Sequence, residues 1–361
     1  MLVNRFSFLV FFTFIFNSVF SQNTDTCTVI LGTDTLNICE MDQHIKNIPR
    51  NATRKLDSLV NYLTKVTDND FEKTYIFYTY IGENMIYDLE KAKRIKHKKV
   101  KEILAPKDLI TRKKGVCGDV AYLFQALCDK GGVTSRVVFG YSSGKRIKLN
   151  IKKKRMNHAW NAVFINGIWF HVDPTWGMKL YTDKKKNKKY VNYYYYLTEP
   201  EKFNKTHLPA DPVYQLCDDP VNWSFFKWRN LSLRRHRYSR SFNYSDSLDQ
   251  RLRLKPVDEL IASANSSLNF IPQNKYTVIQ LLNWPASDFT DKKKLDKTTI
   301  GLEDYYKARK MYTSIIKYCN SLDTKKAKKI AAFYTKKLNI AEREIIRLEK
   351  MEKLKRNPIF P

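Results

Sequence analysis

The sequence predicts an α+β protein, in which a helix that begins at a cysteine packs on an antiparallel sheet and a helical hairpin follows near the C-terminal end. Three patterns predict this arrangement. Apolar residues recur at helical spacing directly after Cys117, β-branched and aromatic residues fill 133–139 and 157–173, and apolar residues beyond residue 300 repeat at alternating intervals of three and four. With 361 residues and 43% hydrophobic content, the chain is long enough to bury one sizeable core and a smaller helical one.

The N-terminal end has the features of a signal peptide. Arg5 precedes an apolar run from Phe6 to Phe20, which is shorter than the ~20 residues of a membrane span. Val19 and Ser21 occupy the positions of a small-x-small cleavage signal. We therefore expect residues 1–21 to be removed and the mature protein to be secreted, periplasmic or at the cell surface, with an uncleaved anchor as the alternative. No later apolar run is long enough to span a bilayer, so no transmembrane span is expected after signal removal.

The charge of the chain is strongly positive. Lys and Arg number 65 against 36 Asp and Glu, a formal net charge of +29, and the excess is spread over many segments. Such a charge attracts anionic partners. Because the chain is expected to be exported and carries no recognised nucleic-acid-binding motif, an acidic cell-surface polymer or an anionic membrane surface fits better than nucleic acid. The basic stretch 91–101 is interpreted as solvated surface, and the second basic stretch, 145–155, is expected to form an irregular strand and a loop.

Six cysteines are too few for a disulfide framework in a chain of 361 residues. Cys27 and Cys39 lie close together near the expected mature start, and they are the candidates for a disulfide in an oxidising compartment. Cys128, Cys217 and Cys319 are interpreted as small buried apolar residues. The sequence contains neither a CxxC nor an HExxH pattern, so it predicts no metal site, and nothing in it indicates a cofactor.

Helices are predicted before the central cysteine. Residues 22–69 are expected to form an N-terminal segment with a helix near Leu56, Leu59 and Leu63, where apolar residues recur at helical spacing. The segment 75–89 (YIFYTYIGENMIYDL) is expected to be the next helix.

The helix that begins at Cys117 is amphipathic, with apolar residues at i, i+3, i+4 and i+7 and a Gly-Gly pair at 131–132 as its end. A cysteine at a helix start lies among unpaired N–H groups at the positive end of the helix dipole, which stabilise the thiolate that attacks a carbonyl. Gly115 and Gly118 let the backbone turn tightly and leave room for a substrate. Asp119 either places a negative charge near the thiolate or caps the helix.

A β-hairpin is predicted around Asn166 and Gly167, because this dipeptide between two β-rich runs is the strongest short hairpin signal. Counting outward from this turn places Trp160 opposite Asp173. His158 is then a diagonal neighbour of Asp173 on the same face, at a backbone distance of ~7–8 Å that long side chains can bridge.

This register predicts a base and the acid that orients it. A histidine hydrogen-bonded through one ring nitrogen to Asp173 is fixed in tautomer, and its other nitrogen is free to accept the proton of Cys117. His171 shares the same face and is the alternative base, but it lies on the same strand as Asp173 and points farther from the open end of the hairpin. Each residue type lies at the element that thiol acyl transfer requires, so Cys117, His158 and Asp173 are the candidate catalytic residues.

The C-terminal part is predicted to be helical. Residues 222–255 are rich in Arg, Ser, Tyr and Asn without a clear period and are expected to be a basic linker or wrap. Within 256–361, apolar residues repeat at three and four over 305–319 and again over 327–348, with a break between them. This pattern is typical of an antiparallel helical hairpin used for packing or docking.

Four segments resemble one known family: FYTYIGENMIYD (77–88), GVCGDVAYLFQALC (115–128), MNHAWNAVFINGIWFHVDPTWG (156–177) and KFNKTHLPADPVYQL (202–216). They are similar to the transglutaminase-like superfamily, whose members share a papain-like α+β fold with Cys, His and Asp in this chain order. The last segment resembles the branch that includes kyphoscoliosis-peptidase-like and cytokinesis-associated proteins. The resemblance covers about 70–217 and implies a transglutaminase-like domain over 70–221.

The resemblance implies that Cys117 is the nucleophile, His158 the base and Asp173 the residue that orients the base. Tyr80 lies where the family often has Trp, so it is the candidate oxyanion donor, with the backbone N–H of Cys117 as the alternative. The implied activity is that of an exported cysteine hydrolase that acts on a protein or peptide substrate. Two alternatives stay open: a cross-linking acyltransferase, in which an amine replaces water, and a non-catalytic cell-surface binding or scaffold module.

Overall fold

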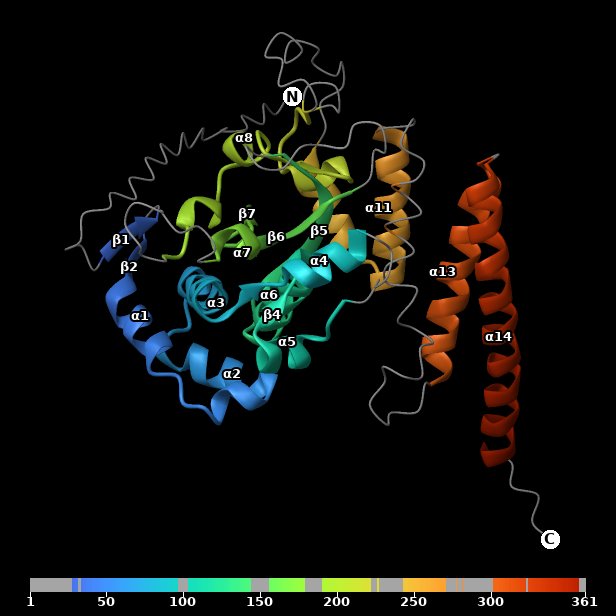
Figure 1. Ribbon diagram of the computed structural model, residues 1–361, viewed down its shortest axis with the longest axis horizontal. Helices are drawn as coiled ribbons and strands as arrows, with labels where there is room; N and C mark the ends of the chain where they lie inside the picture. Colours follow the sequence, from blue (N-terminus) through green and yellow to red (C-terminus); the bar gives the residue numbers. More distant parts are fainter. Residues whose placement is uncertain are drawn as a thin grey trace, which may run out of the picture.

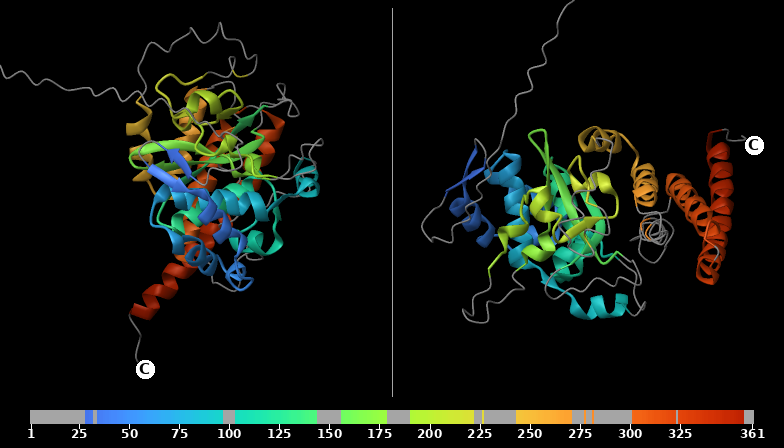
Figure 2. Two further views of the ribbon diagram at one scale, coloured as in Figure 1. Left: turned by 90° about the vertical axis from the view of Figure 1, so that its left-hand side faces the viewer. Right: turned by 90° about the horizontal axis from the view of Figure 1, so that it is seen from above.

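The computed structural model describes residues 28–31, 34–96, 103–143, 156–178, 190–221, 226, 243–270, 277, 281, 301–322 and 324–356. The expected signal peptide, Cys27 and the basic stretch 145–155 lie outside these residues. N-terminal helices, a central sheet and C-terminal helices follow one another along the molecule (Figures 1 and 2).

The N-terminal helices surround α3 (Asp70–Asn84), which is buried throughout Thr74–Gly82. The side chain of Asn69 accepts two N–H bonds from the first turn of α3 and so starts this helix. The helix predicted over 75–89 therefore exists, but it starts earlier and ends at Asn84. The elements before it are β1 (Thr28–Leu31), β2 (Asp34–Asn37), α1 (Ile38–Lys46), η1 (Ala52–Arg54), α2 (Leu56–Leu63) and η2 (Thr64–Val66).

A short parallel strand pair precedes the central helix. β3 (Ile86–Tyr87) pairs with β4 (Lys114–Gly115), and α4 (Leu89–Lys96) and α5 (Pro106–Arg112) lie between them in the chain. Lys91 on α4 is buried, so the interpretation of 91–101 as solvated surface is wrong for this residue. The reason is a carboxylate partner on the central helix, described below.

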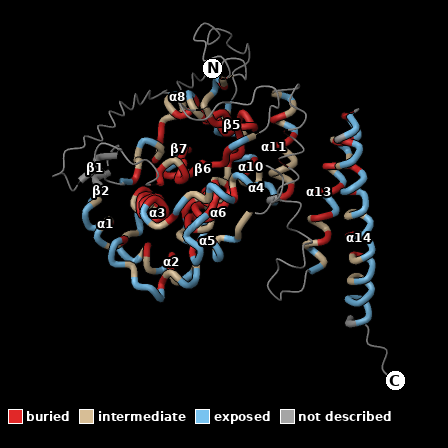
Figure 3. The backbone as a smooth tube through the Cα atoms, viewed as in Figure 1, coloured by how far each residue is buried: buried red, intermediate tan, exposed pale blue. Residues whose placement is uncertain are grey.

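The central helix α6 (Cys117–Lys130) begins at the predicted cysteine. Its start is fixed by Asp119, whose carboxylate accepts the backbone N–H of Val116 at 2.8 Å and so caps the helix. Its end lies before Gly132, which has a φ of +82° that favours glycine. Its apolar residues are buried against α3 and the sheet (Figure 3).

The central sheet has four antiparallel strands in the order β7-β6-β5-β8. The predicted hairpin register is confirmed, because Ile165 pairs with Ile168 and the pairing runs on to Asn161 and Val172. The edge strand next to β5 was not predicted from the sequence. The strands are β5 (Thr134–Ser142), β6 (His158–Ile165), β7 (Ile168–Val172) and β8 (His207–Pro209).

Both faces of the sheet are covered by other elements. On one face, Val163 and Phe170 join the core formed with α3 and α6. On the other face, Trp160 and Trp169 pack against Phe203 and neighbouring residues. The elements on this second side are α8 (Pro200–Phe203), η4 (Pro212–Gln215) and α10 (Tyr244–Leu252), while α7 (Pro174–Gly177) and η3 (Tyr193–Tyr195) follow β7.

The C-terminal helices include the predicted hairpin, formed by α13 (Leu302–Asn320) and α14 (Lys325–Arg356). α11 (Pro256–Phe270) lies between the sheet and this hairpin (Figures 1 and 2). The stretch 222–255, expected as a linker or wrap, contains α10, which packs on η4. Within the part of the chain that the structure describes, no helix is both long and apolar enough to cross a membrane.

Candidate active site

Cys117 is the first residue of α6, and its thiol is free and half-exposed. The strand pair β3–β4 fixes the chain just before it, because Tyr87 pairs with Gly115. Gly115 has no room for a side chain, since an added Cβ would lie 2.7 Å from the Leu109 side chain. The sulfur therefore sits at a helix N-terminus that a strand and a tight contact hold in place.

His158 and Asp173 form a buried hydrogen bond, with 2.6 Å between Nε2 and Oδ2. His158 begins β6, and Asp173 directly follows β7, so the hairpin register brings them together across the sheet. His171 does not contact Asp173. Its Nε2 lies 3.4 Å from the carbonyl of Gln215, and burial lowers its pKa to about 3.

Asp173 accepts four hydrogen bonds. Its Oδ1 accepts the backbone N–H groups of Thr175 and Trp176, at 2.9 and 3.1 Å. Its Oδ2 accepts from His158 and, at 3.1 Å, from His207. Burial alone would raise the pKa of Asp173, but the charge of His158 and these hydrogen bonds hold it well below its ordinary value. Asp173 is therefore the anionic partner in these hydrogen bonds at neutral pH.

His158 is held as an imidazolium. Burial lowers its pKa, but the charge and hydrogen bond of Asp173 and the hydrogen bond of Cys117 outweigh burial and raise the pKa to about 10. Because Nε2 is bonded to Asp173, the ring nitrogen left for another partner is Nδ1.

His207 on β8 is a residue that the sequence analysis missed. It lies in the segment 202–216 that resembles the family, but that resemblance assigned it no role. It is fully buried, and burial together with the charge of His158 lowers its pKa to about 4 in spite of Asp173. His207 is therefore neutral at physiological pH.

The two tyrosines near the site differ in position. Tyr80 is fully buried in α3, no described residue hydrogen-bonds its hydroxyl, and burial alone raises its pKa to about 12. Its role as oxyanion donor stays a prediction. The pKa of Tyr87 is raised by burial and then by the charges of Cys117, Asp119 and Asp173. Tyr87, on the strand before α4, is thus a second phenol near the site, and no pattern in the sequence singled it out.

Asp119 does not place an uncompensated charge beside Cys117. Lys91 donates to both of its carboxylate oxygens, at 2.9 and 2.8 Å, and the backbone N–H groups of Leu104 and Val116 donate as well. These bonds neutralise the Asp119 carboxylate, and they connect α4 and the chain before α5 to the start of α6.

Among the described residues, one group has three potential metal-ligand atoms within 4.8 Å of one another: the ring nitrogens of His158 and His207 and a carboxylate oxygen of Asp173. Ligand atoms around a tetrahedral zinc ion, at bonds of about 2.0 Å, are separated by about 3.3 Å. The 2.6 Å between His158 and Asp173 is shorter than this. The cluster thus has the geometry of direct hydrogen bonds rather than of a metal cage.

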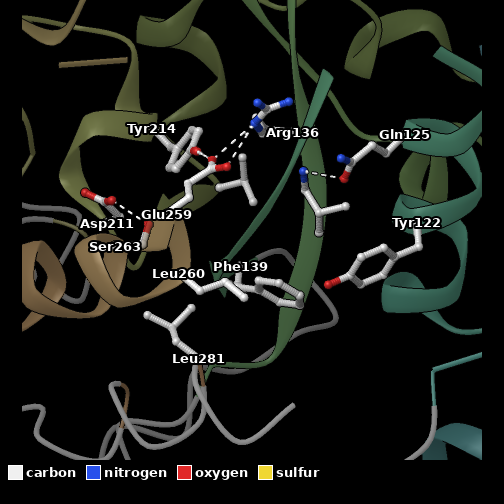
Figure 4. A pocket seen from close by; sticks show the side chains of 12 residues that line it. Tyr122, Gln125, Arg136, Phe139, Asp211, Tyr214, Glu259, Leu260, Ser263 and Leu281 are labelled. Carbon is white, nitrogen blue, oxygen red and sulfur yellow. Dashed lines mark hydrogen bonds and ion pairs between the residues drawn. The ribbon is translucent and has the colours of Figure 1, made fainter. Parts of the chain in front are cut away.

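A separate cavity of about 150 Å³ lies between β5, α6 and α11 (Figure 4). Its polar side chains are paired with one another: Arg136 with Glu259 at 3.2 Å, Tyr214 with Glu259 at 2.7 Å, and Asp211 with Ser263 at 2.6 Å. These bonds join the sheet to the C-terminal helices. None of the three predicted catalytic residues lines the cavity.

Comparison with known proteins gives a family match over part of the chain. The family model of the transglutaminase-like superfamily matches residues 57–174. The chain is similar to kyphoscoliosis peptidase of Mus musculus, 32% identical over 174 residues, which are 48% of this chain and 26% of that protein. It is also similar to Hillarin of Drosophila melanogaster, 28% identical over 118 residues, which are 29% of this chain and 14% of that protein.

The chain thus spans about a quarter of the length of the first relative. Among solved structures, it is similar to a proposed cysteine protease from Cytophaga hutchinsonii at 23% identity and a TM-score of 0.27. That similarity covers 39% of this chain and 44% of the other.

Proposed function

Because residues 57–174 form a transglutaminase-like domain, we propose that the protein is a cysteine hydrolase that cleaves an amide bond by acyl transfer. Cys117 is the nucleophile, His158 the general base and acid, and Asp173 the residue that orients His158. The observation that carries this proposal is the buried hydrogen bond of 2.6 Å between Asp173 and His158, which begins a strand that packs against the helix that starts at Cys117.

The reaction has two steps. The thiolate of Cys117 forms a C–S bond with the carbonyl carbon, the amide C–N bond breaks, and His158 gives its proton to the departing amine. Water then forms a C–O bond while His158 takes one of its protons, and the C–S bond breaks to restore the thiolate. The backbone N–H of Cys117, at the start of α6, is the proposed donor to the oxyanion.

The proposed substrate is a peptide or protein amide. The similar protein from Mus musculus is named kyphoscoliosis peptidase, and this name supports a peptide or protein substrate for the present chain. Half-exposure of Cys117, beside a fully buried Asp173, supports access of a substrate to the sulfur while the charge that orients the base stays away from water.

We also propose that the protein is exported. Cys39 is disulfide-bonded, which supports an oxidising compartment. Its expected partner Cys27 and the expected signal peptide lie outside the described residues.

A thiol-reactive probe tests the proposed nucleophile. Iodoacetamide at neutral pH should label Cys117 first, and Cys117→Ala should abolish both this labelling and peptide hydrolysis. Cys217→Ala is the matched control, because Cys217 is also free. It is only partly buried, so its prediction as a buried residue was wrong, but partial burial still raises its pKa to about 12. Labelling of Cys217 ahead of Cys117 would oppose the proposal.

A further inference from the structure

Two imidazoles share one carboxylate oxygen in the site. His158 Nε2 and His207 Nε2 lie 2.6 and 3.1 Å from Asp173 Oδ2, and His207 is fully buried. A fully buried histidine so close to a general base requires a physical account, because the proposed reaction uses only one of the two rings.

The tautomer of His207 follows from its neighbours. Asp173 is an anion and can only accept, so the Nε2 of neutral His207 carries the hydrogen. Its Nδ1 is then an acceptor for the hydroxyl of Thr206 at 2.9 Å, and the carbonyl of Phe203 lies beside both groups, at 3.3 Å from that hydroxyl. His207 thus presents one fixed N–H to Asp173.

The ring of His207 cannot easily turn away from this contact. It stacks on Phe203 at 4.1 Å between ring centres and packs against Trp176 at 4.5 Å and Trp160 at 5.1 Å. On β8, its backbone pairs with Ser142 of β5. The donor is therefore held in place by packing on several sides.

We propose that His207 is a positioning residue, a second donor that shares Asp173 Oδ2 with His158 and so limits how strongly Asp173 binds the proton of His158. The proposal rests on the proposed hydrolase function. A general acid must release its proton to the departing amine, and a carboxylate that served His158 alone would hold that proton more tightly.

The other titratable groups around His158 and Asp173 do not donate a hydrogen bond to Asp173 Oδ2. Cys117, on α6, contributes to the raised pKa of His158, whose Nε2 is bonded to Asp173. The charge of Asp173 helps to raise the pKa of Tyr78 on α3 and of Tyr87 on β3. The Tyr78 hydroxyl, however, donates its hydrogen bond to the carbonyl of Asn192. His171 lies beyond Phe203 and does not contact Asp173. His207 is the one further side chain among the described residues that donates to Oδ2.

Two substitutions separate donation from packing. In His207→Gln the side-chain amide can place an N–H where Nε2 was, whereas His207→Phe keeps a ring for the stack and removes the donor. His171→Phe is the matched control, because His171 is equally buried and stacks on Phe203 at 4.3 Å. A packing role predicts that the Phe variant resembles the parent, and a donor role predicts that the Gln variant does.

The readout is the titration of His158, followed by NMR on histidine-labelled full-length protein. In His207→Phe we expect its midpoint to rise by about half to one pH unit above that of the parent. His207→Gln and His171→Phe should stay at the parent value. Thr206→Val, which removes the bond that fixes the tautomer, should shift the midpoint in the same direction by less, and it tests the proposal if His207→Phe does not fold.

Hydrolysis provides the second readout. In His207→Phe, the pH at which the hydrolysis rate falls on the alkaline side should rise by the same amount as the His158 midpoint. Turnover at neutral pH should be lower by about 10-fold. An unchanged His158 midpoint in His207→Phe, or a shift of equal size in His207→Gln, would overturn the proposal. Because the titration needs no substrate, a parent protein without a reactive Cys117 would overturn the proposed function separately.

Discussion

The ammonium group of Lys91 lies 2.9 and 2.8 Å from the two carboxylate oxygens of Asp119, and both side chains are buried beside the first turn of α6. Asp119 is two residues from Cys117, so this pair both caps the helix and cancels a negative charge that would oppose the thiolate. We therefore expect Lys91 to affect both the stability of the fold and the reactivity of the candidate nucleophile.

Lys91→Met should destabilise the protein by about 3–5 kcal/mol, because it leaves a buried carboxylate without its partner. It should also move alkylation of Cys117 to higher pH. Denaturant unfolding and the pH dependence of iodoacetamide labelling measure the two effects. Lys93→Met is the control, since Lys93 pairs with Glu90 on the exposed side of the same helix and its loss should change neither quantity.

The double variant Lys91→Met with Asp119→Asn separates charge from packing. If charge is the cause, the double variant should return the labelling profile toward that of the parent, although the helix keeps only part of its cap. A double variant as shifted as Lys91→Met alone would contradict the electrostatic reading.

Asp173→Asn should lower acyl transfer roughly 10²–10⁴-fold while the protein stays folded. The amide oxygen can still accept the N–H groups of Thr175 and Trp176, so the start of α7 is kept, but the charge that stabilises the His158 imidazolium is lost. Steady-state rates and circular dichroism check the two parts. His171→Ala should retain activity, and the reverse order of effects would make His171 the base.

The unfolding free energy should fall as pH drops from about 6.5 to 4. The folded-state pKa values of His207 and His171 are lowered to about 4 and 3, so the unfolded chain binds protons in this range that the folded chain does not. Each histidine contributes a slope of up to about 1.4 kcal/mol per pH unit. Denaturant titrations across this range should show a shallower slope in His171→Phe. An unchanged slope would mean that this histidine is charged in the folded state.

The sequence predicted the part of the site that depends on local geometry. Asn166 and Gly167 have φ values of +50° and +81°, which suit the tight turn, and the turn alone set the register that joins His158 to Asp173. It did not predict His207, because β8 is a three-residue edge strand with no periodic pattern. A contact that depends on how distant segments pack leaves no such pattern in the sequence.

The buried Lys91 was missed for the same reason. A basic run is typical of an exposed segment, so nothing in the local sequence marks Lys91 as buried. Its burial is favourable only because Asp119, 28 residues away in the chain, lies next to it. Tyr87 likewise could not be told from its neighbours on composition, since its approach to Cys117 depends on the pairing of β3 with β4.

Asp211 connects the domain to the C-terminal helices. Its buried carboxylate accepts from Arg251 of α10 at 3.2 Å and from Ser263 of α11 at 2.6 Å. A chain of residues 22–221, which contains the expected domain, lacks both partners. We expect it to be less stable than a chain of residues 22–270 by about 3–5 kcal/mol, because a buried charge that loses its partner is costly.

Denaturant unfolding of the two chains, with Asp211→Asn introduced into each, measures this dependence. In the longer chain Asp211→Asn should be destabilising, since it breaks the pair with Arg251. In the shorter chain it should recover part of the loss, because an uncharged amide is cheaper to bury alone than a carboxylate. Equal stability of the two parent chains would instead show that residues 22–221 fold independently, and that α10 and α11 only rest against the sheet through the bonds around Asp211.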